Sequence, residues 1–438
     1  MIAAVIGKNF GDEGKGLAVD SFCSRVPHCL VVKHNGGAQA GHTVCFEGRR
    51  FVFHQLSSGS FRGADTYWAT TYYPDLYKLR EEIEEFLSKL RGDNTEANGA
   101  ASGSMSGVSA GTPRIYASKD TAVTVIDDII LNMALETSRG DGRHGSCGMG
   151  INEADLRTKA GFALTFGELR TMDAESLTAR LSGIRREYVL PRFKKDILKE
   201  NGEEKRREDL EEYADLLENE EVLHNAAQEM MEALQYVEII DDEAAFLRSR
   251  ENIVFESGQG LLLDSKNKEF APHVTASRTG LHNVGLLLRK AGMTLTEACY
   301  VSRTYVTRHG AGPLPCECER EKLTGEIHGE DLCGIREDCT NVGNPWQGSI
   351  RYAKHESIER FLAPVREDLA EFREITKDNP ERVSLFLTHL NETGAQILLE
   401  NGNIKAESLE KSDNFRKVFD RVYLSDAENA ECLFKDFQ

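Results

Sequence analysis

Short apolar runs that end in glycine or in polar residues recur along the chain. The first covers residues 1–7 (MIAAVIG) and the second covers residues 29–33 (CLVVK). Runs of this length without polar alternation are typical of strands that are buried on both faces of a parallel sheet. The same pattern predicts strands at residues 252–255, 298–306 and 383–387. Because each run leads into a polar or glycine-containing loop, we expect repeated strand–loop–helix units.

Two other segments have a different pattern. Residues 172–250 are dense in Glu, Lys, Arg and Leu, and apolar positions such as Leu210, Tyr213 and Leu217 recur three or four residues apart. This period predicts amphipathic helices, which we expect to form a helical subdomain on one side of the sheet. Residues 94–113 consist mainly of Gly, Ser, Ala and Asn, a composition that favours a flexible surface excursion.

Together these elements predict an α/β fold with a large, mostly parallel central sheet flanked by helices and with helical insertions. A chain of 438 residues can bury a sizeable core, and we interpret residues 1–438 as a single domain. A P-loop-like GDEGKG loop follows the first strand, and a helix is expected to begin near Lys15. In such sheets, ligands bind beyond the carboxyl ends of the strands.

The charge balance excludes some functions. The chain has 53 basic and 72 acidic residues and a formal charge of −19, which argues against a surface for nucleic acid. No apolar run approaches the length of a bilayer, so we expect no membrane segment. The ten cysteines are scattered, which is typical of thiols in a reducing compartment. We therefore expect a cytoplasmic protein that holds any anionic ligand in a local pocket.

The loop at residues 11–16 is the first segment whose residue types indicate a bound ligand. Backbone N–H groups of a glycine-rich turn at a helix start can cradle phosphate oxygens, and Lys15 adds a positive charge. The Walker A pattern is not met, because its first glycine is missing and glycine follows the lysine. Asp12 and Glu13 place carboxylates beside this cradle. A phosphate would repel them unless a carboxylate binds Mg²⁺ or acts as a base.

Five blocks of the chain resemble the adenylosuccinate synthetase family. The first is GDEGKG, and the second is QAGHT at residues 39–43, where the family reads close to NAGHT. The remaining blocks are GSCGMGI at residues 145–151, GQGLLLD at residues 258–264 with VTAS at residues 274–277, and TRHGAGPLP at residues 307–315. They occur in the order that the family has and span most of the chain.

The resemblance implies a C–N ligase that acts on a 6-oxopurine nucleotide such as IMP, GMP or dGMP. Asp12 would take the N1 proton while O6 attacks the γ-phosphate of a nucleoside triphosphate, and an amine would then displace phosphate at C6. His42 would stabilise the moving phosphoryl group, and Mg²⁺ would lie between Asp12, the carbonyl of Gly41 and the phosphates. The order makes sense because O6 is a poor nucleophile until N1 loses its proton. The family analogy also implies a homodimer.

The same resemblance implies three sets of binding residues. The triphosphate would be held by Glu13, Gly14, Lys15, Gly16, Thr43, Thr388 and Asn391. The purine nucleotide would be held by Gln39, Ser146, Cys147, Gln259, Thr275 and Arg308. The amine, an amino acid or another compound, would be held by Thr340, Asn341 and Arg351.

Two loops depart from the family pattern. Where the family reads the guanine of GTP with a TKLD-like segment, residues 388–391 read THLN. An amide both donates and accepts hydrogen bonds, as the edge of adenine requires, so Asn391 favours ATP over GTP. The alternative is that Asn391 merely weakens the selection of guanine. The family's arginine-rich TTGRPRR loop aligns with TNVGNPWQG at residues 340–348. Either Arg351 and Lys354 replace the missing charges, or the amine is smaller or less acidic than aspartate.

Other differences concern the acceptor nucleotide. Gln39 replaces the family's asparagine, and the arginine that reaches a neighbouring subunit's nucleotide aligns with Gly161, with Arg157 nearby. These changes resemble the phage-type branch of the family, which joins aspartate to dGMP and tolerates ATP. The first-loop aspartate is altered in that branch, whereas Asp12 is present here, so the branch stays open.

Two further interpretations of the function stay open. One is a catalytically silent regulator that binds purine nucleotides, and the other is a plain hydrolase of nucleoside triphosphates. Asp12, Lys15 and His42 favour an enzyme over a regulator, because a protein that only binds has no use for a base beside the phosphate cradle.

Overall fold

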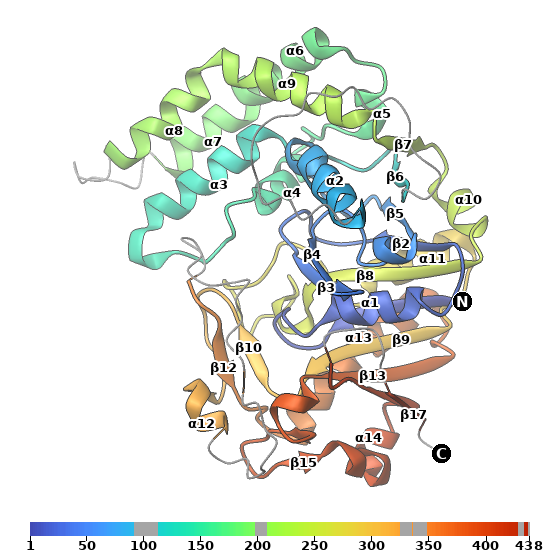
Figure 1. Ribbon diagram of the computed structural model, residues 1–438. Helices are drawn as coiled ribbons and strands as arrows, with labels where there is room; N and C mark the ends of the chain where they lie inside the picture. Colours follow the sequence, from blue (N-terminus) through green and yellow to red (C-terminus); the bar gives the residue numbers. More distant parts are fainter. Residues whose placement is uncertain (92–112, 198–207, 325–334, 336–347, 428–432, 437–438) are drawn as a thin grey trace.

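A large central sheet organises the protein (Figure 1). The computed structural model describes residues 1–91, 113–197, 208–324, 335, 348–427 and 433–436. Within these residues the sheet has ten strands in the order β17-β16-β13-β9-β1-β8-β2-β5-β6-β7. All neighbouring strands are parallel except the antiparallel edge pair β16 and β17. The predicted α/β fold with a mostly parallel sheet is confirmed.

The strands of the central sheet have the following bounds: β1 (Ile2–Gly7), β2 (Cys29–Lys33), β5 (Asp65–Trp68), β6 (Ile115–Ser118), β7 (Val237–Ile240), β8 (Asn252–Gly260), β9 (Glu297–Arg303), β13 (Arg382–Thr388), β16 (Arg421–Leu424) and β17 (Leu433–Asp436). Smaller sheets are formed by β3 (His42–Phe46) with β4 (Arg49–Phe53), by β10 (Val306–Arg308), β12 (Arg351–Ala353) and β11 (Glu317–Cys318), and by β14 (Gln396–Ile397) with β15 (Ile404–Lys405).

The α-helices of the described residues are α1 (Lys15–Cys23), α2 (Leu76–Arg91), α3 (Ile126–Arg139), α4 (Ile151–Lys159), α5 (Phe166–Leu169), α6 (Ala174–Ile184), α7 (Leu190–Asp196), α8 (Glu208–Glu218), α9 (Glu220–Leu234), α10 (Glu243–Arg248), α11 (His282–Ala291), α12 (Arg320–Thr324), α13 (Ile358–Thr376) and α14 (Asp413–Arg416). A π-helical turn at Arg185–Val189 joins α6 to α7. None of the described helices combines the length and the apolar character that crossing a membrane requires.

The apolar runs became strands because the sheet buries both of their faces. In β1, the side chains of Ala3, Ala4, Val5 and Ile6 are fully buried. The predicted run at residues 298–306 is divided, since β9 belongs to the central sheet and β10 to the small antiparallel one. The backbone N–H of Thr304 still donates to the carbonyl of Thr388 at 3.2 Å, which extends the pairing with β13, so the chain leaves the central sheet only after Thr304.

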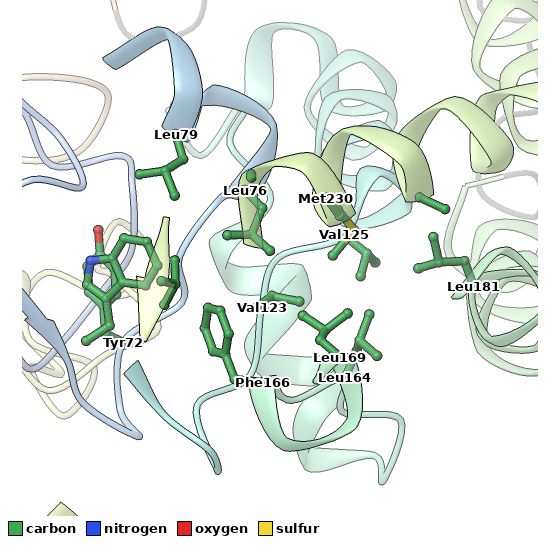
Figure 2. Close-up of a cluster of buried hydrophobic side chains, with 14 of the residues drawn as sticks. Tyr72, Leu76, Leu79, Val123, Val125, Leu164, Phe166, Leu169, Leu181 and Met230 are labelled. Carbon is green, nitrogen blue, oxygen red and sulfur yellow. The ribbon is translucent and has the colours of Figure 1, made fainter. Parts of the chain in front are cut away.

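The segment at residues 172–250 contains helices α6 to α10, but it also contributes the edge strand β7. Its apolar side chains share one core with helices that precede residue 172 (Figure 2). Val125, Phe166 and Leu169 pack in the same cluster as Leu181 and Met230. The helical layer therefore begins earlier in the chain than its charge pattern indicates. The predicted excursion at residues 94–113 lies outside the described residues, except for residue 113.

Candidate active site

The loop between β1 and α1 is held by its own side chains. The Glu13 carboxylate accepts hydrogen bonds from the backbone N–H groups of Asn9 at 2.8 Å and Gly11 at 2.9 Å. Lys15 lies 3.1 Å from the same carboxylate and donates to the carbonyl of Gly11. Both charged side chains are buried. In this structure Glu13 and Lys15 therefore define the shape of the loop.

Three segments assigned to the triphosphate are in contact. A Cβ atom on Gly16 would lie 2.9 Å from the carbonyl oxygen of Thr43, so the second loop packs directly on the first. A Cβ atom on Gly14, whose φ is +94°, would lie 3.1 Å from the Thr388 methyl group. The Thr388 hydroxyl donates to the carbonyl of Glu13 at 2.8 Å. Glycine is needed at both positions because a side chain would push these segments apart.

His42 is oriented by a buried carboxylate that the sequence motifs did not single out. Nδ1 of His42 lies 2.5 Å from Oε1 of Glu256, in the middle of β8. The same carboxylate accepts from the backbone N–H of Ser58 at 3.2 Å and lies 3.8 Å from Nζ of Lys33. The available signal was the position of Glu256, which directly follows the predicted strand at residues 252–255.

The charges of this network follow from burial and pairing. Burial alone would raise the pKa of Glu256, but the Lys33 ammonium and the His42 and Ser58 hydrogen bonds outweigh it and lower the pKa to about 2. Burial lowers the pKa of His42, against the opposite effect of Glu256. A neutral imidazole beside an ionised carboxylate donates through Nδ1–H, which leaves Nε2 of His42 for a ligand.

Asp12 faces the chain segment that follows β10. Oδ2 of Asp12 lies 3.4 Å from Nε2 of His309, and 27% of the Asp12 side chain is exposed. The backbone carbonyl of Asp12 accepts a hydrogen bond from Arg303. Mg²⁺ prefers hard oxygen ligands and is commonly bound by one or two carboxylates together with substrate phosphates. The partly exposed Asp12 carboxylate and the carbonyl of the exposed Gly41 would supply oxygen ligands of this kind.

Two glutamine side chains converge beside the second loop. A Cβ atom on Gly36 would lie 2.9 Å from Nε2 of Gln39 and 3.5 Å from Oε1 of Gln259. Asn35 fixes this arrangement by bonding both the N–H and the carbonyl of Gly258. Within the described part of the chain, the buried Oε1 atoms of both glutamines lack hydrogen-bond partners. Buried polar atoms without partners are rare in folded proteins, so these two amides suit a bound polar group.

The residues assigned to the phosphate of the purine nucleotide lie on two loops. Ser146 exchanges hydrogen bonds with Asn132 at 3.0 and 3.2 Å. Burial raises the pKa of the Cys147 thiol. The backbone N–H of Thr275 donates to the carbonyl of Leu263 at 2.8 Å.

A third loop joins these two. A Cβ atom on Gly145 would lie 2.8 Å from the backbone nitrogen of Ala311, so residues 144–147 pack on residues 309–312. Nδ1 of His273 lies 3.3 Å from the carbonyl oxygen of His144. The three resembling blocks that contain Ser146, Thr275 and His309 thus contact one another.

Two arginines from the predicted sets hold backbone. Arg308 is buried and donates to the carbonyls of His273 at 2.9 Å and Pro313 at 2.6 Å. Burial, and then Arg351, lower its pKa to about 10, so the guanidinium stays charged near neutral pH. A nucleotide contact by Arg308 would use Nε, which has no partner among the described residues. Arg351 donates to the carbonyls of Gly310 and Gly312 and to Glu317.

The remaining assignments are placed as follows. Asn391 lies in the 3₁₀ turn directly after β13, close in sequence to Thr388. Thr340 and Asn341 lie outside the described residues. Arg157 is fully buried, and its guanidinium is occupied by Asp128 and by the carbonyls of Val123 and Phe162. In this conformation Arg157 does not extend toward a neighbouring subunit.

The model of one protein family, described as adenylosuccinate synthetase, matches residues 4–342. The chain belongs to the adenylosuccinate synthetase family. Similar proteins include the adenylosuccinate synthetase of Bdellovibrio bacteriovorus, which is 28% identical over 319 residues, and that of Saccharophagus degradans, which is 29% identical over 329 residues. These matches cover 72% and 74% of this chain. They span 65% and 67% of the relatives' own lengths.

Two solved structures extend the family's fold to nearly the whole chain. The fully ligated adenylosuccinate synthetase of Plasmodium falciparum has a TM-score of 0.62 and 16% identity, and the likeness covers 99% of this chain and 100% of that one. The succinoaminodeoxyadenylate synthetase of cyanophage S-2L, bound to dGMP and dATP, has a TM-score of 0.54 and 14% identity over 99% of this chain and 94% of that one. At these identities the likeness establishes the fold alone.

Proposed function

We propose that this chain is a C–N bond-forming ligase that activates O6 of a 6-oxopurine nucleotide by phosphorylation. The observation that carries this proposal is the contact between the two loops, with His42 held against the ionised Glu256 beside the phosphate cradle. A protein that only bound nucleotides would gain nothing from an imidazole whose ring is fixed by a buried carboxylate.

The reaction has two balanced steps. Asp12 accepts the N1 proton while O6 attacks the γ-phosphorus, so that a 6-phosphoryl nucleotide forms and a nucleoside diphosphate leaves. The amine nitrogen then bonds to C6, the C6–O6 bond breaks, and inorganic phosphate departs while the nitrogen loses a proton. O6 phosphorylation is required because oxide is a poor leaving group, whereas phosphate is a good one.

His42 and the metal act on the transferred phosphoryl group. Nε2 of His42 is the ring nitrogen that Glu256 leaves available. We propose that the ring takes up a second proton there when the anionic phosphates bind, and that this N–H then stabilises the equatorial oxygens in the transition state while Glu256 balances the positive ring. Mg²⁺ would be held by Asp12, the carbonyl of Gly41 and the phosphates, and it would supply further neutralisation of charge. Lys15 and the backbone of residues 14–16 would bind the β- and γ-phosphates once Lys15 exchanges its contact with Gly11 for phosphate oxygen.

Asn391 supports ATP as the phosphoryl donor. A carboxylate at this position would accept two hydrogen bonds from guanine, whereas an amide can also donate to an acceptor on adenine. We expect a higher kcat/KM with ATP than with GTP, and we expect Asn391→Asp to shift the ratio toward GTP. A clear preference of the unaltered protein for GTP would contradict this part of the proposal.

The contacts of the Arg351 guanidinium bear on how acidic the amine substrate can be. Arg351 is engaged with Glu317 and two backbone carbonyls, so in this conformation it gives a dicarboxylate no bidentate partner. We therefore propose an amine that is smaller or less acidic than aspartate. By analogy with the family, we also propose a homodimer, which would elute at about twice the 48.8 kDa of one chain.

A single panel tests the function. The protein is incubated with Mg²⁺, ATP or GTP, a 6-oxopurine monophosphate and one amine at a time, while phosphate release and product mass are followed. A ligase gives phosphate and a nucleotide whose mass includes the amine. Release without any amine would indicate a triphosphate hydrolase. Measurable nucleotide binding with no release under any combination would indicate a regulator.

A further inference from the structure

Two consecutive carbonyls of the phosphate loop are held by side chains that lie far away in the sequence. Arg303, the last residue of β9, donates through Nε to the carbonyl of Asp12. Thr388, the last residue of β13, donates through its hydroxyl to the carbonyl of Glu13 at 2.8 Å. In a trans peptide the next N–H points opposite to the carbonyl, so these bonds also fix the N–H groups of residues 13 and 14. Both N–H groups belong to the loop that is proposed to cradle phosphate.

Both holding side chains are bonded in turn to the segment 389–392. Nη1 of Arg303 donates to the Tyr305 hydroxyl at 3.1 Å, and this hydroxyl donates to Oε2 of Glu392 at 2.6 Å. Nδ1 of His389 lies 2.8 Å from the hydroxyl of Thr388. Two hydrogen-bonded chains therefore run from the segment 389–392 to the backbone of the phosphate loop.

The chain through Tyr305 is shielded from water. Tyr305 is fully buried, and Arg303 and Glu392 are also buried. Buried hydrogen bonds that share a group support one another and keep their directions, because water does not compete for them. The 3₁₀ turn that ends at Glu392 also contains Asn391, which is proposed to contact the base of the triphosphate. A displacement of this turn would thus displace the carbonyl of Asp12.

We propose that Arg303 and Tyr305 are positioning residues that link the base site of the triphosphate to the phosphate loop, so that recognition of the base raises kcat as well as affinity. The link rests on the proposed function, in which Asn391 contacts the base. The base itself does not react, but binding energy from a remote part of a substrate can be used to orient the reacting groups. Here that energy holds the turn, and through Tyr305 and Arg303 it holds the loop around the transferred phosphoryl group.

A double-mutant cycle tests the link. Asn391→Ala and Tyr305→Phe are made singly and together, and kcat and KM for ATP are measured at saturating purine monophosphate and amine. Phenylalanine keeps the buried ring and removes only the hydroxyl that joins Arg303 to Glu392. Each single variant should lower kcat roughly tenfold, which corresponds to one lost buried hydrogen bond. The double variant should also lose roughly tenfold, not roughly a hundredfold, because the second change breaks a link that is already broken.

The matched control is Tyr67→Phe. Tyr67 is also fully buried, and its hydroxyl donates to the buried carboxylate of Glu243 at 3.1 Å. The substitution removes the same kind of hydrogen bond, so we expect a loss of stability similar to that of Tyr305→Phe. It should leave kcat unchanged, and combined with Asn391→Ala it should give the kcat of Asn391→Ala alone.

Three results would overturn the link. The first is a double variant in which the two single effects on kcat multiply, because the turn and the loop would then act independently. The second is an unchanged kcat in either single variant, with any effect confined to KM. The third is an equal loss of kcat in Tyr305→Phe and Tyr67→Phe, which would assign the loss to reduced stability.

The link and the ligase function can fail separately. The same cycle is measured on the Kd of an ATP analogue in which an NH group bridges the β- and γ-phosphates, in the presence of Mg²⁺. If the effects on Kd are non-additive but phosphate is never released from ATP, the ligase function fails while the link stands. If phosphate is released and the effects on kcat multiply, the ligase function stands and the link fails.

Discussion

The two sides of the candidate active site differ in how completely their polar groups are paired. On the side of the phosphate loop, Glu13 is paired with Lys15, and Glu256 is paired with His42 and Lys33. On the side assigned to the purine, the buried Oε1 atoms of Gln39 and Gln259 have no hydrogen-bond partner in the part of the chain that the structure describes. Nε2 of His309, which lies near this side, has no hydrogen-bond partner there either.

Whether a buried polar group is paired indicates whether it supports the fold or is available to a ligand. A paired buried charge stabilises its partner, and removing one member leaves the other uncompensated. An unpaired buried amide contributes nothing to folding until a ligand arrives. Substitutions of the paired charges on the phosphate-loop side should therefore reduce stability, whereas substitutions of the unpaired amides on the purine side should reduce binding alone.

The largest effect is expected for Asp12→Asn. The amide cannot accept the N1 proton, so phosphate release in the presence of an amine should fall about 10³-fold. The free energy of unfolding should hardly change, because the Asp12 carboxylate is partly exposed and its 3.4 Å contact with Nε2 of His309 is not a hydrogen bond. Denaturant unfolding and initial rates measure the two quantities. A large loss of stability would place Asp12 with the paired groups instead.

Glu256→Gln should reduce both activity and stability. The amide no longer fixes the His42 ring or balances Lys33, so turnover should fall about 10²-fold and unfolding should become about 3–5 kcal/mol easier. Glu256→Gln combined with Lys33→Met should recover much of the stability but not the turnover. If the double variant is no more stable than the single one, the Lys33 charge is not the reason for the loss.

The stability effect of Glu256 should also depend on pH. Its pKa in the folded protein is about 2, below the ordinary value of 4.5, so its contribution is fully present above about pH 4.5. The contribution is lost as the pH falls toward 2. The difference in unfolding free energy between the unaltered protein and Glu256→Gln should therefore shrink over this range in denaturant titrations at several pH values.

Gln39→Leu should have a smaller effect that is confined to binding. Leucine removes an unpaired buried acceptor and keeps an apolar side chain in the same place, so the free energy of unfolding should be unchanged or slightly higher. The Kd for the purine monophosphate should rise roughly tenfold. Gln55→Leu is the matched control, because Oε1 of the buried Gln55 accepts from the backbone N–H of Asp75 at 2.8 Å. That variant should lose about 1–3 kcal/mol of stability.

The smallest effect is expected for Thr388→Val. The change removes the hydroxyl that donates to the carbonyl of Glu13, and it should cost about 1 kcal/mol of unfolding free energy. Thr388→Ser keeps the hydroxyl and should retain most of that stability. A loss of stability in Thr388→Ser but not in Thr388→Val would assign the effect to the methyl group that packs on Gly14.

Five of the ten strands of the central sheet, β1, β2, β8, β9 and β13, and the glycine-rich loops could be predicted from the sequence alone. Both faces of a parallel strand are buried, so strands such as β1 and β8 leave continuous apolar runs that can be recognised without a structure. The glycines at residues 14 and 16 were predicted as part of a phosphate-binding turn at a helix start, and the structure adds a second reason for them. Close packing of backbone on backbone tolerates no side chain, and the requirement remains visible in the sequence.

Which side chains meet across the site can be known only from the tertiary structure. Glu256 is 214 residues from His42, and His309 is 297 residues from Asp12, and no local pattern connects such pairs. The same holds for Arg308 and Arg351, which the family resemblance assigned to ligand contacts and which the structure shows bonded to backbone carbonyls. Side-chain pairing across loops depends on the relative positions of strand ends in space, and these positions are set by the packing of the whole sheet.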